Sequence, residues 1–102
     1  MDMLTPSLLK RFRKIGSQEH RTDPLVIAKF FTPDSNWTWY AIEYDEQEQM
    51  FFGLVSGFET ELGYFSKIEL EYTRGSLGLF PERDLHFNEC RLSEIYKQYQ
   101  PV

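Results

Sequence analysis

Two strand-like stretches joined by a short charged turn constrain the fold of this chain more than any other feature. Residues 36–45 read NWTWYAIEYD and residues 50–57 read MFFGLVSG. Both are rich in aromatic and β-branched side chains, which favour strands. The connection DEQEQ, residues 45–49, is charged or polar throughout. Because so short a connection joins antiparallel neighbours, the sequence predicts a hairpin and an antiparallel sheet.

A further strand is predicted before this hairpin. Residues 23–32, DPLVIAKFFT, combine β-branched and aromatic residues and are bounded by Pro24 and Pro33. The segment TPDSN, residues 32–36, is typical of a turn, because Pro33 presets φ and the short polar side chains after it can bond their own backbone. Together the three stretches predict a meander of adjacent antiparallel strands.

Neither face of the stretch at residues 36–45 is plainly polar. Strict alternation divides it into two faces: Trp37, Trp39, Ala41 and Glu43 on one, and Thr38, Tyr40, Ile42 and Tyr44 on the other. We expect most of these rings to form core and cross-strand pairs. If one face of the sheet lies bare, either Tyr40 with Tyr44 or Trp37 with Trp39 would form an exposed aromatic surface, and such surfaces usually contact something.

The segment TPSLLKRFRKIG, residues 5–16, has the punctuation of a helix. Thr5 suits the N-cap, Pro6 the first helical position, and Gly16 the residue after the last turn. Apolar residues recur at helical spacing and basic residues fill the other faces: Leu8, Leu9, Phe12 and Ile15 against Lys10, Arg11, Arg13 and Lys14. A packing helix with a solvated basic side is favoured over a helix that grips phosphate.

The second half of the chain predicts shorter elements. Residues 57–75 read as a loop, a short strand and a helix that starts at a capping box of Ser66 and Glu69 and ends at Gly75. A glycine-loosened turn follows, then a brief strand DLHF at residues 84–87, and a last short helix within CRLSEIYKQY, residues 90–99.

These elements predict one α+β domain over residues 1–102. Its expected architecture is a small antiparallel sheet of three to five strands with an N-terminal helix and one or two later short helices. A chain of 102 residues suffices for one modest core. If the helices blanket one face of the sheet, the other face is left to solvent.

The charge distribution disfavours polynucleotide binding. The net charge is −5, and residues 30–73 hold nine acidic residues against one basic residue, Lys67. Most polynucleotide affinity comes from neutralised phosphates, which this stretch repels. The sequence shows no apolar run long enough to cross a bilayer and no signal peptide, so we expect a cytoplasmic protein without membrane contact. A single cysteine, Cys90, agrees with a reducing compartment.

Two groups of polar residues are candidates for catalysis. Glu59 and Glu61 flank Thr60 in a glycine-bounded loop, and Asp84 with His86 would share a face of the predicted strand DLHF. A solvated or structural role is favoured for the two glutamates. An Asp that orients a His is half of a hydrolytic arrangement, but the sequence offers no nucleophile in a strained elbow. We therefore expect no catalytic residues and no enzyme.

Cofactor and metal sites are not expected either. The chain lacks phosphate-binding loops of the Walker and dinucleotide types. Cys90, His86 and His20 are its only soft metal ligands, which argues against structural zinc. Arg83 is expected to pair with Glu82 or with an acid of the Glu59 and Glu61 loop.

Four strings in the chain carry a family resemblance. DPLVIAKFFTPDSNWTWYAIEYD, FFGLVSGFETELGYFS, ERDLHF and LSEI are similar to the small bacterial family called domain of unknown function 2958. The resemblance runs from the opening MLTP to about Ile95. It implies a short cytoplasmic protein, often carried by plasmids, conjugative elements and phages beside DNA-processing and anti-defence genes. It implies no activity and no catalytic residues.

The favoured function is that of a non-enzymatic accessory or regulatory protein that docks on a protein partner, and the expected partner is part of a host defence or DNA-transfer machine. The TPDSNWTW turn and the GFETELG loop are expected to build a shared surface with an aromatic anchor and a polar rim. The candidate binding residues are Asn36, Trp37, Trp39, Tyr40, Glu59, Glu61 and Arg83.

The sequence is also compatible with two other functions. A single-stranded nucleic-acid-binding protein would use the Lys10–Lys14 helix for phosphate and Trp37, Trp39 or Tyr40 for base stacking. A small hydrolase would need Glu59, Glu61, Asp84 and His86 in one pocket. The aromatic surface could also be covered by a second copy of the chain, as a homodimer.

Overall fold

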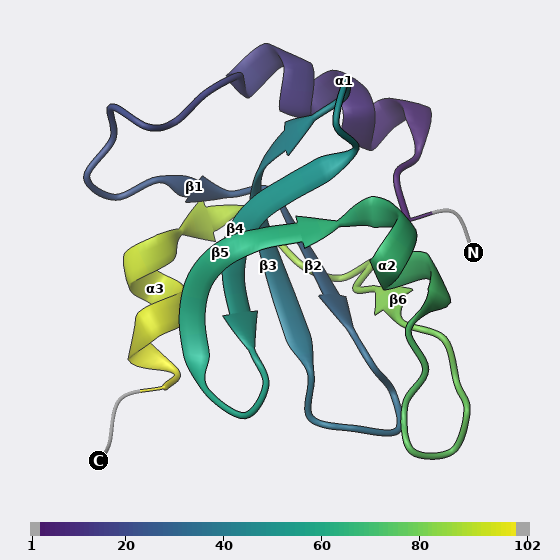
Figure 1. The fold of residues 1–102 in the computed structure, drawn as a ribbon. Helices are drawn as coiled ribbons and strands as arrows, with labels where there is room; N and C mark the ends of the chain where they lie inside the picture. The colour runs from purple at the N-terminus through teal and green to yellow at the C-terminus, as the bar shows by residue number, and fades with distance from the viewer. Residues whose placement is uncertain (1–2, 100–102) are drawn as a thin grey trace.

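The computed structural model describes residues 3–99, and within them a five-stranded antiparallel sheet has helices on both faces (Figure 1). The strand order is β5-β4-β3-β2-β6. The strands are β2 Ala28–Phe31, β3 Thr38–Asp45, β4 Met50–Ser56, β5 Thr60–Ser66 and β6 Glu82–Arg83. The predicted α+β class, with an N-terminal helix and two later short helices, is confirmed.

Strands β2, β3 and β4 form the predicted meander, and β5 continues it. In register, Phe30 faces Trp39, Trp39 faces Val55, and Val55 faces Glu61. The stretch at residues 23–32 is two strands rather than the single one predicted. Its first part, β1 Leu25–Val26, pairs with β7 Cys90–Arg91 in a separate two-stranded sheet.

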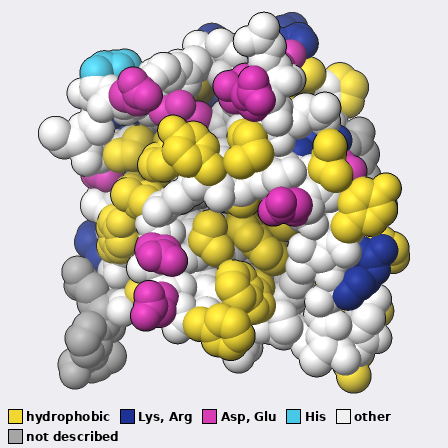
Figure 2. Space-filling model, in the orientation of Figure 1, with side chains coloured by type: hydrophobic (Ala, Val, Ile, Leu, Met, Phe, Trp, Pro, Cys, Tyr) yellow, Lys and Arg dark blue, Asp and Glu magenta, His cyan; other side chains and the backbone are white. Residues whose placement is uncertain are grey.

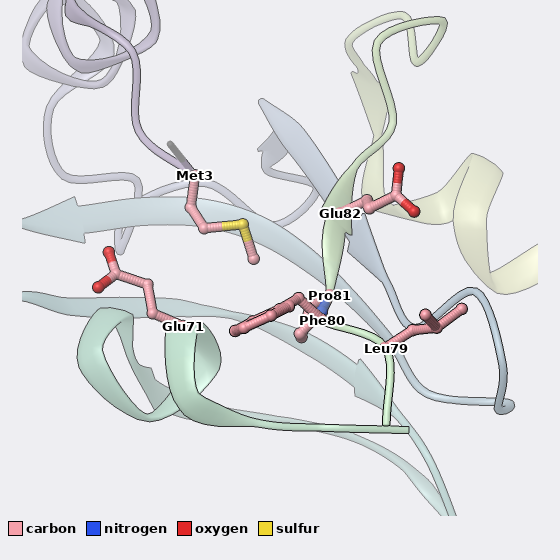
Figure 3. A pocket seen from close by; sticks show the side chains of 6 residues that line it. All are labelled: Met3, Glu71, Leu79, Phe80, Pro81 and Glu82. Atoms are coloured by element: carbon pink, nitrogen blue, oxygen red, sulfur yellow. The ribbon is translucent and has the colours of Figure 1, made fainter. Parts of the chain in front are cut away.

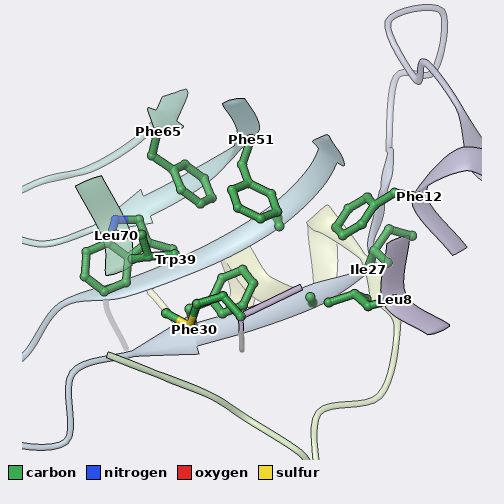
Figure 4. Packing of buried hydrophobic residues seen from close by; sticks show 11 residues of the cluster. Leu8, Phe12, Ile27, Phe30, Trp39, Phe51, Phe65 and Leu70 are labelled. Atoms are coloured by element: carbon green, nitrogen blue, oxygen red, sulfur yellow. The ribbon is translucent and has the colours of Figure 1, made fainter. Parts of the chain in front are cut away.

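Helix α1, Pro6–Ile15, covers what we call the first face of the sheet, which carries Trp39 and Phe51. Its predicted caps are confirmed: the Thr5 hydroxyl accepts from the Leu8 N–H, and Gly16 follows the last turn with a φ of 66°. The hydrophobic core on this face is drawn in Figure 4: Met3, Leu8, Phe12, Ile27, Ala28, Phe30, Trp39, Ala41, Phe51, Phe65 and Leu70.

Helix α2, Lys67–Tyr72, also packs on the first face, through the buried Leu70. The predicted capping residue is confirmed, since the Ser66 hydroxyl accepts from the Glu69 N–H at 3.2 Å. The helix ends at Tyr72 and not at Gly75 as predicted. Thr73 is already extended, and both its N–H and its hydroxyl donate to the Glu69 carbonyl.

Helix α3, Leu92–Lys97, lies against the second face, which carries Tyr40 and Leu54. Leu92 and Ile95 pack there with Val26, Tyr40, Ile42 and Leu54. The helices therefore do not all share one face, and the second face is partly covered. A residue distant in sequence caps the N-terminus of α3: the Asp23 carboxylate accepts from the N–H and the hydroxyl of Ser93.

A β-bulge overturns part of the predicted alternation in β3. The pairing with β4 shifts between Ala41 and Glu43, so that Ile42 and Glu43 both lie on the second face. Tyr44 moves to the first face, where its ring lies 4.7 Å from that of Phe51. The sheet thereby gains an aromatic contact under α1.

The predicted strand DLHF is wrong in position. The strand at this place is β6, Glu82–Arg83, which pairs with Phe31 and Phe30 at the edge of the sheet. Beyond it the chain turns, because the Asp84 carboxylate accepts from the His86 N–H at 2.9 Å. Asp84 and His86 therefore do not share a strand face.

Candidate functional site

Two turns meet at one end of the sheet. Trp37 ends the β2–β3 turn, and Phe58 lies in the β4–β5 turn, with their rings 5.5 Å apart and nearly perpendicular. Gly57 permits this contact, since a Cβ there would come within 2.3 Å of the Trp37 ring. The structure thus brings together the two segments from which the sequence predicted a shared surface.

Trp37 rests on Trp39. Their rings stack at 6.0 Å with an interplanar angle of 26°. Trp39 is buried, Trp37 is half-buried, and Phe58 is 94% exposed. Trp39 is therefore a support beneath the surface, and Trp37 and Phe58 are the rings that a partner could reach.

Two carboxylates border these rings. Glu59 and Glu61 are exposed, and they line a hollow of about 230 Å³ whose other walls are Trp37, Val55 and Phe58. The ion pairs formed within residues 3–99 include neither glutamate. We call these five residues, Trp37, Val55, Phe58, Glu59 and Glu61, the tryptophan–glutamate surface.

Hydrogen bonds hold both turns in place. In the first turn the Thr32 N–H donates to the Trp37 carbonyl at 3.0 Å, and the Thr32 and Ser35 hydroxyls contact each other. Asn36 lies exposed on this turn, next to Trp37. In the second turn the Ser56 and Thr60 hydroxyls lie 3.2 Å apart. The surface therefore rests on a hydrogen-bonded framework.

A third segment, residues 76–79, is held beside the first turn by hydrogen bonds, and sequence reasoning missed it. The Asp34 carboxylate accepts from the N–H groups of Leu77 and Leu79, and the Ser76 hydroxyl donates to the Asp34 carbonyl. Leu77 is 81% exposed. The apolar residues of SLGLF, residues 76–80, were the only sequence signal for this segment. The pattern of a glycine-loosened turn does not predict which part of the fold such residues contact.

A larger hollow, of about 490 Å³, lies next to this segment (Figure 3). Its lining is apolar with two carboxylates: Met3, Glu71, Leu79, Phe80, Pro81 and Glu82. Two cationic side chains of the protein already contact residues that line this hollow. Lys67 pairs with Glu71 at 2.5 Å, and the Arg74 guanidinium lies 3.3 Å from the centre of the Phe80 ring.

Tyr40 and Arg83 do not join the tryptophan–glutamate surface. Tyr40 is buried on the second face, where its hydroxyl bonds that of Tyr99 at 2.9 Å, and burial raises its pKa. Arg83 lines a hollow of about 530 Å³ against α1, together with Lys10 and Lys14. Its predicted ion pair is wrong, since no ion pair within residues 3–99 includes Arg83.

The four residues proposed for a hydrolase are separated. Glu61 stands opposite Val55 on the first face. Asp84 pairs at 3.7 Å with Lys29, whose ammonium lies over the Tyr40 ring of the second face. Among residues 3–99 no group of three or more His, Cys, Asp or Glu side chains is arranged to hold a metal ion.

The basic helix also lies away from the tryptophans. Phe12 of α1 packs on Tyr44, near the last residue of β3. Helix α1 lies at the opposite end of β3 from the β2–β3 turn, which holds Trp37 (Figure 1). Two of its cations are already paired: Arg11 binds Glu89 and Arg13 binds Glu46, each through two hydrogen bonds. Phosphate contacts on α1 and base stacking on Trp37 would therefore use opposite ends of the molecule.

The profile of a family described as "Protein of unknown function (DUF2958)" matches residues 3–100. The chain belongs to this family. No curated protein and no solved structure matches it. The DUF2958 match includes all five residues of the tryptophan–glutamate surface. Between residues 3 and 99 no helix has both the length and the apolar character needed to cross a bilayer.

Proposed function

We propose that this DUF2958 protein is a non-enzymatic accessory or regulatory protein that docks on a protein partner through the tryptophan–glutamate surface. One observation carries the proposal: the Phe58 ring, 94% exposed, contacts Trp37 beside two carboxylates, Glu59 and Glu61, that take part in no ion pair formed within residues 3–99. When a partner covers exposed apolar groups of this kind, their removal from water favours binding.

The composition of the surface is that of a protein interface. Aromatic anchors surrounded by a polar rim carry most of the binding energy in such interfaces. Glu59 and Glu61 form the rim here, so the matching partner surface carries basic residues. The same two carboxylates repel the phosphates of a nucleic acid.

The cellular setting is part of the proposal and rests on the family resemblance. The protein acts in the cytoplasm as an accessory factor of a plasmid, conjugative element or phage, and its docking serves DNA transfer or opposes host defence. Its partner is then a protein of the host or of the element itself.

Photo-crosslinking tests the surface directly. Phe58 is replaced by p-benzoylphenylalanine, and the protein is irradiated in an extract of its own cells. The matched control carries the same group at Leu85, which is 64% exposed and lies on the turn after β6. We expect a discrete adduct from position 58 that is absent from position 85. Charge reversal by Glu59→Lys with Glu61→Lys should reduce its yield.

The surface is wrongly chosen if both positions give the same adducts. It is also wrongly chosen if the adduct at position 58 keeps its yield after Trp37→Ala and after both charge reversals, in variants whose unfolding shows an intact fold.

A further inference from the structure

Strand β5 is an edge of the sheet, and alternate backbone groups along it point outward. Two hydrogen bonds fix the pattern: the Lys67 N–H donates to the Gln49 carbonyl, and the Gly57 N–H donates to the Glu59 carbonyl. With the register of β4 and β5, residues 59, 61, 63, 65 and 67 therefore face β4. The N–H and C=O groups of Thr60, Leu62, Tyr64 and Ser66 point away from the sheet.

The two faces of this edge differ in chemistry. Leu62 and Tyr64 lie on the second face, where they are 46% and 71% exposed. Together with Phe52 they border a hollow of about 300 Å³. On the first face the edge carries Glu61, preceded by Glu59 in the turn. A strand laid along β5 therefore meets apolar groups on one side and carboxylates on the other.

Gly63, at the centre of β5, serves no steric need within residues 3–99. A Cβ at this position would have no heavy atom within 4 Å, and its φ is not in the left-handed region. Its partner in register, Gly53, differs, because a Cβ there would lie 1.8 Å from the Tyr40 carbonyl oxygen. A glycine inside a strand is often found at a bulge, at a tight bend, or where a ligand or another backbone approaches closely, and the pairing of β4 with β5 has no bulge at Gly63.

The surroundings of β5 carry negative charge. In Figure 1 the strand passes in front of β4 and β3, and Figure 2 shows the same view in space-filling form. Acidic and hydrophobic side chains are mixed over the middle of this view, while Lys and Arg lie toward its margins. A segment that binds along this edge is therefore bound more tightly if it carries positive charge.

We infer that the outer edge of β5 receives an extended segment of the protein partner, which joins the sheet as an antiparallel strand and alternates apolar with basic residues. This inference rests on the proposed function and names the partner chemistry. The apolar residues lie opposite Leu62 and Tyr64, and the basic residues lie toward Glu61 and Glu59. Strand addition of this kind takes its affinity from main-chain hydrogen bonds and its specificity from alternate side chains.

A second copy of the chain fits this edge less well. It would bring another net charge of −5 to an edge that already carries Glu59 and Glu61, which lie outside the ion pairs formed between residues 3 and 99. Repulsion of this kind opposes self-association. A segment with basic residues at every second position neutralises the same glutamates.

N-methylated peptides test the inference. The probe is an acetylated, amidated and fluorescently labelled Lys-Val-Lys-Val-Lys-Val-Lys, and binding to the full chain is measured by anisotropy. In antiparallel addition the valine N–H groups face β5 and the lysine N–H groups face away. Methylation of the valine nitrogens should therefore weaken binding about tenfold or more, and methylation of the lysine nitrogens should leave it unchanged.

Protein variants provide the matched control. Tyr64→Pro removes an N–H that points away from β4, whereas Tyr64→Val removes the ring and keeps the N–H. Proline is tolerated on edge strands where its nitrogen faces solvent. We expect Tyr64→Pro to lose the peptide and Tyr64→Val to retain most of the binding. If Tyr64→Pro does not fold, the peptide series alone decides.

Several outcomes would overturn the inference. They are equal binding of both methylated peptides, equal binding of Lys-Lys-Lys-Val-Val-Val-Lys, absence of any peptide binding, or a stable dimer in sedimentation that Tyr64→Pro dissociates. None of these alters the cross-linking at Phe58, so failure of the edge strand can be told from failure of the docking surface.

Discussion

Trp37 and Trp39 stack with their ring centroids 6.0 Å apart, yet Trp39 is 7% exposed and Trp37 is only half-buried. They occupy alternate positions on one face of the sheet, and Trp39 stands between Phe30 and Val55 in register. The inner ring therefore belongs to the core, and the outer ring belongs to the candidate surface. Core packing and the candidate surface are therefore divided between Trp39 and Trp37, two positions apart in the chain.

The first prediction compares alanine at these two positions. Trp39→Ala should lower the free energy of unfolding by about 3–5 kcal/mol, because it empties a buried site. Trp37→Ala should cost about 1–2 kcal/mol, because that ring is only half-buried. Urea unfolding followed by tryptophan fluorescence and circular dichroism gives both values. Equal losses would contradict the division between core and surface.

The second prediction concerns the paired glycines Gly53 and Gly63. Gly53→Ala should lower the free energy of unfolding by about 3 kcal/mol or more, because the new methyl group would overlap the Tyr40 carbonyl of β3. Gly63→Ala meets open space and should raise it by about 0.5–1 kcal/mol, since the unfolded chain loses freedom. Thermal or urea unfolding measures both.

Each glycine variant is the control for the other, because the two residues stand opposite in the same ladder. A Gly63→Ala variant as unstable as Gly53→Ala would show that Gly63 is needed by the monomer. Gly63 would then no longer support strand addition at β5.

The third prediction is an alternation in amide hydrogen exchange along β5. The N–H groups of Glu61, Gly63 and Phe65 face β4 and should be protected, while those of Leu62 and Tyr64 point outward and should exchange quickly. NMR of the free protein at single-residue resolution measures this. Uniform protection would mean that the outer edge is already covered.

The fourth prediction concerns pH. The hydroxyl and the N–H of Ser93 bond the Asp23 carboxylate and lower its pKa. A pKa lowered in the folded state contributes stability above the unfolded value, near 3.8, and this stability is lost as the pH falls through the lower folded value. Asp23→Asn should therefore destabilise the protein at pH 7 and much less at strongly acidic pH.

Urea unfolding of both proteins across acidic pH values checks this prediction. Ser93→Ala is the matched control, because it removes the hydroxyl donor and leaves the carboxyl group in place. A gap between wild type and Asp23→Asn that stays constant with pH would contradict the account of this cap.

The parts of the fold that sequence reasoning predicted carry local signals. Thr5, Pro6 and Gly16 punctuate α1 within the segment itself, and Ser66 marks the start of α2 in the same way. The meander follows from short turns between apolar runs, and it brings the Trp37 turn beside the Phe58 turn without further information.

The remaining parts depend on distant partners. Strands β6 and β7 have two residues each, too few for a period, and they exist because β2 and β1 offer them free edges. Gln18, between α1 and β1, is buried because its side-chain amide donates to the carbonyls of Leu25 and Ile42. No local pattern encodes such contacts.

The candidate site was predictable to the same extent. Trp37, Glu59 and Glu61 converge because they flank neighbouring turns of one meander. Tyr40 lies elsewhere because the strand alternation places it on the second face. The Leu77 segment was missed because Asp34, which holds it, is 43 residues away in the chain.

The pairing of β7 with β1 fastens the last helix to residues near the start of the sheet. During synthesis on the ribosome, Tyr40, Ile42 and Leu54 are made long before residues 90–97, which cover them. The growing chain can thus cover the first face of the sheet early, but α3 covers the second face only when translation is nearly finished. A chain released before that point would expose the apolar second face of its sheet, and quality-control proteases would degrade it.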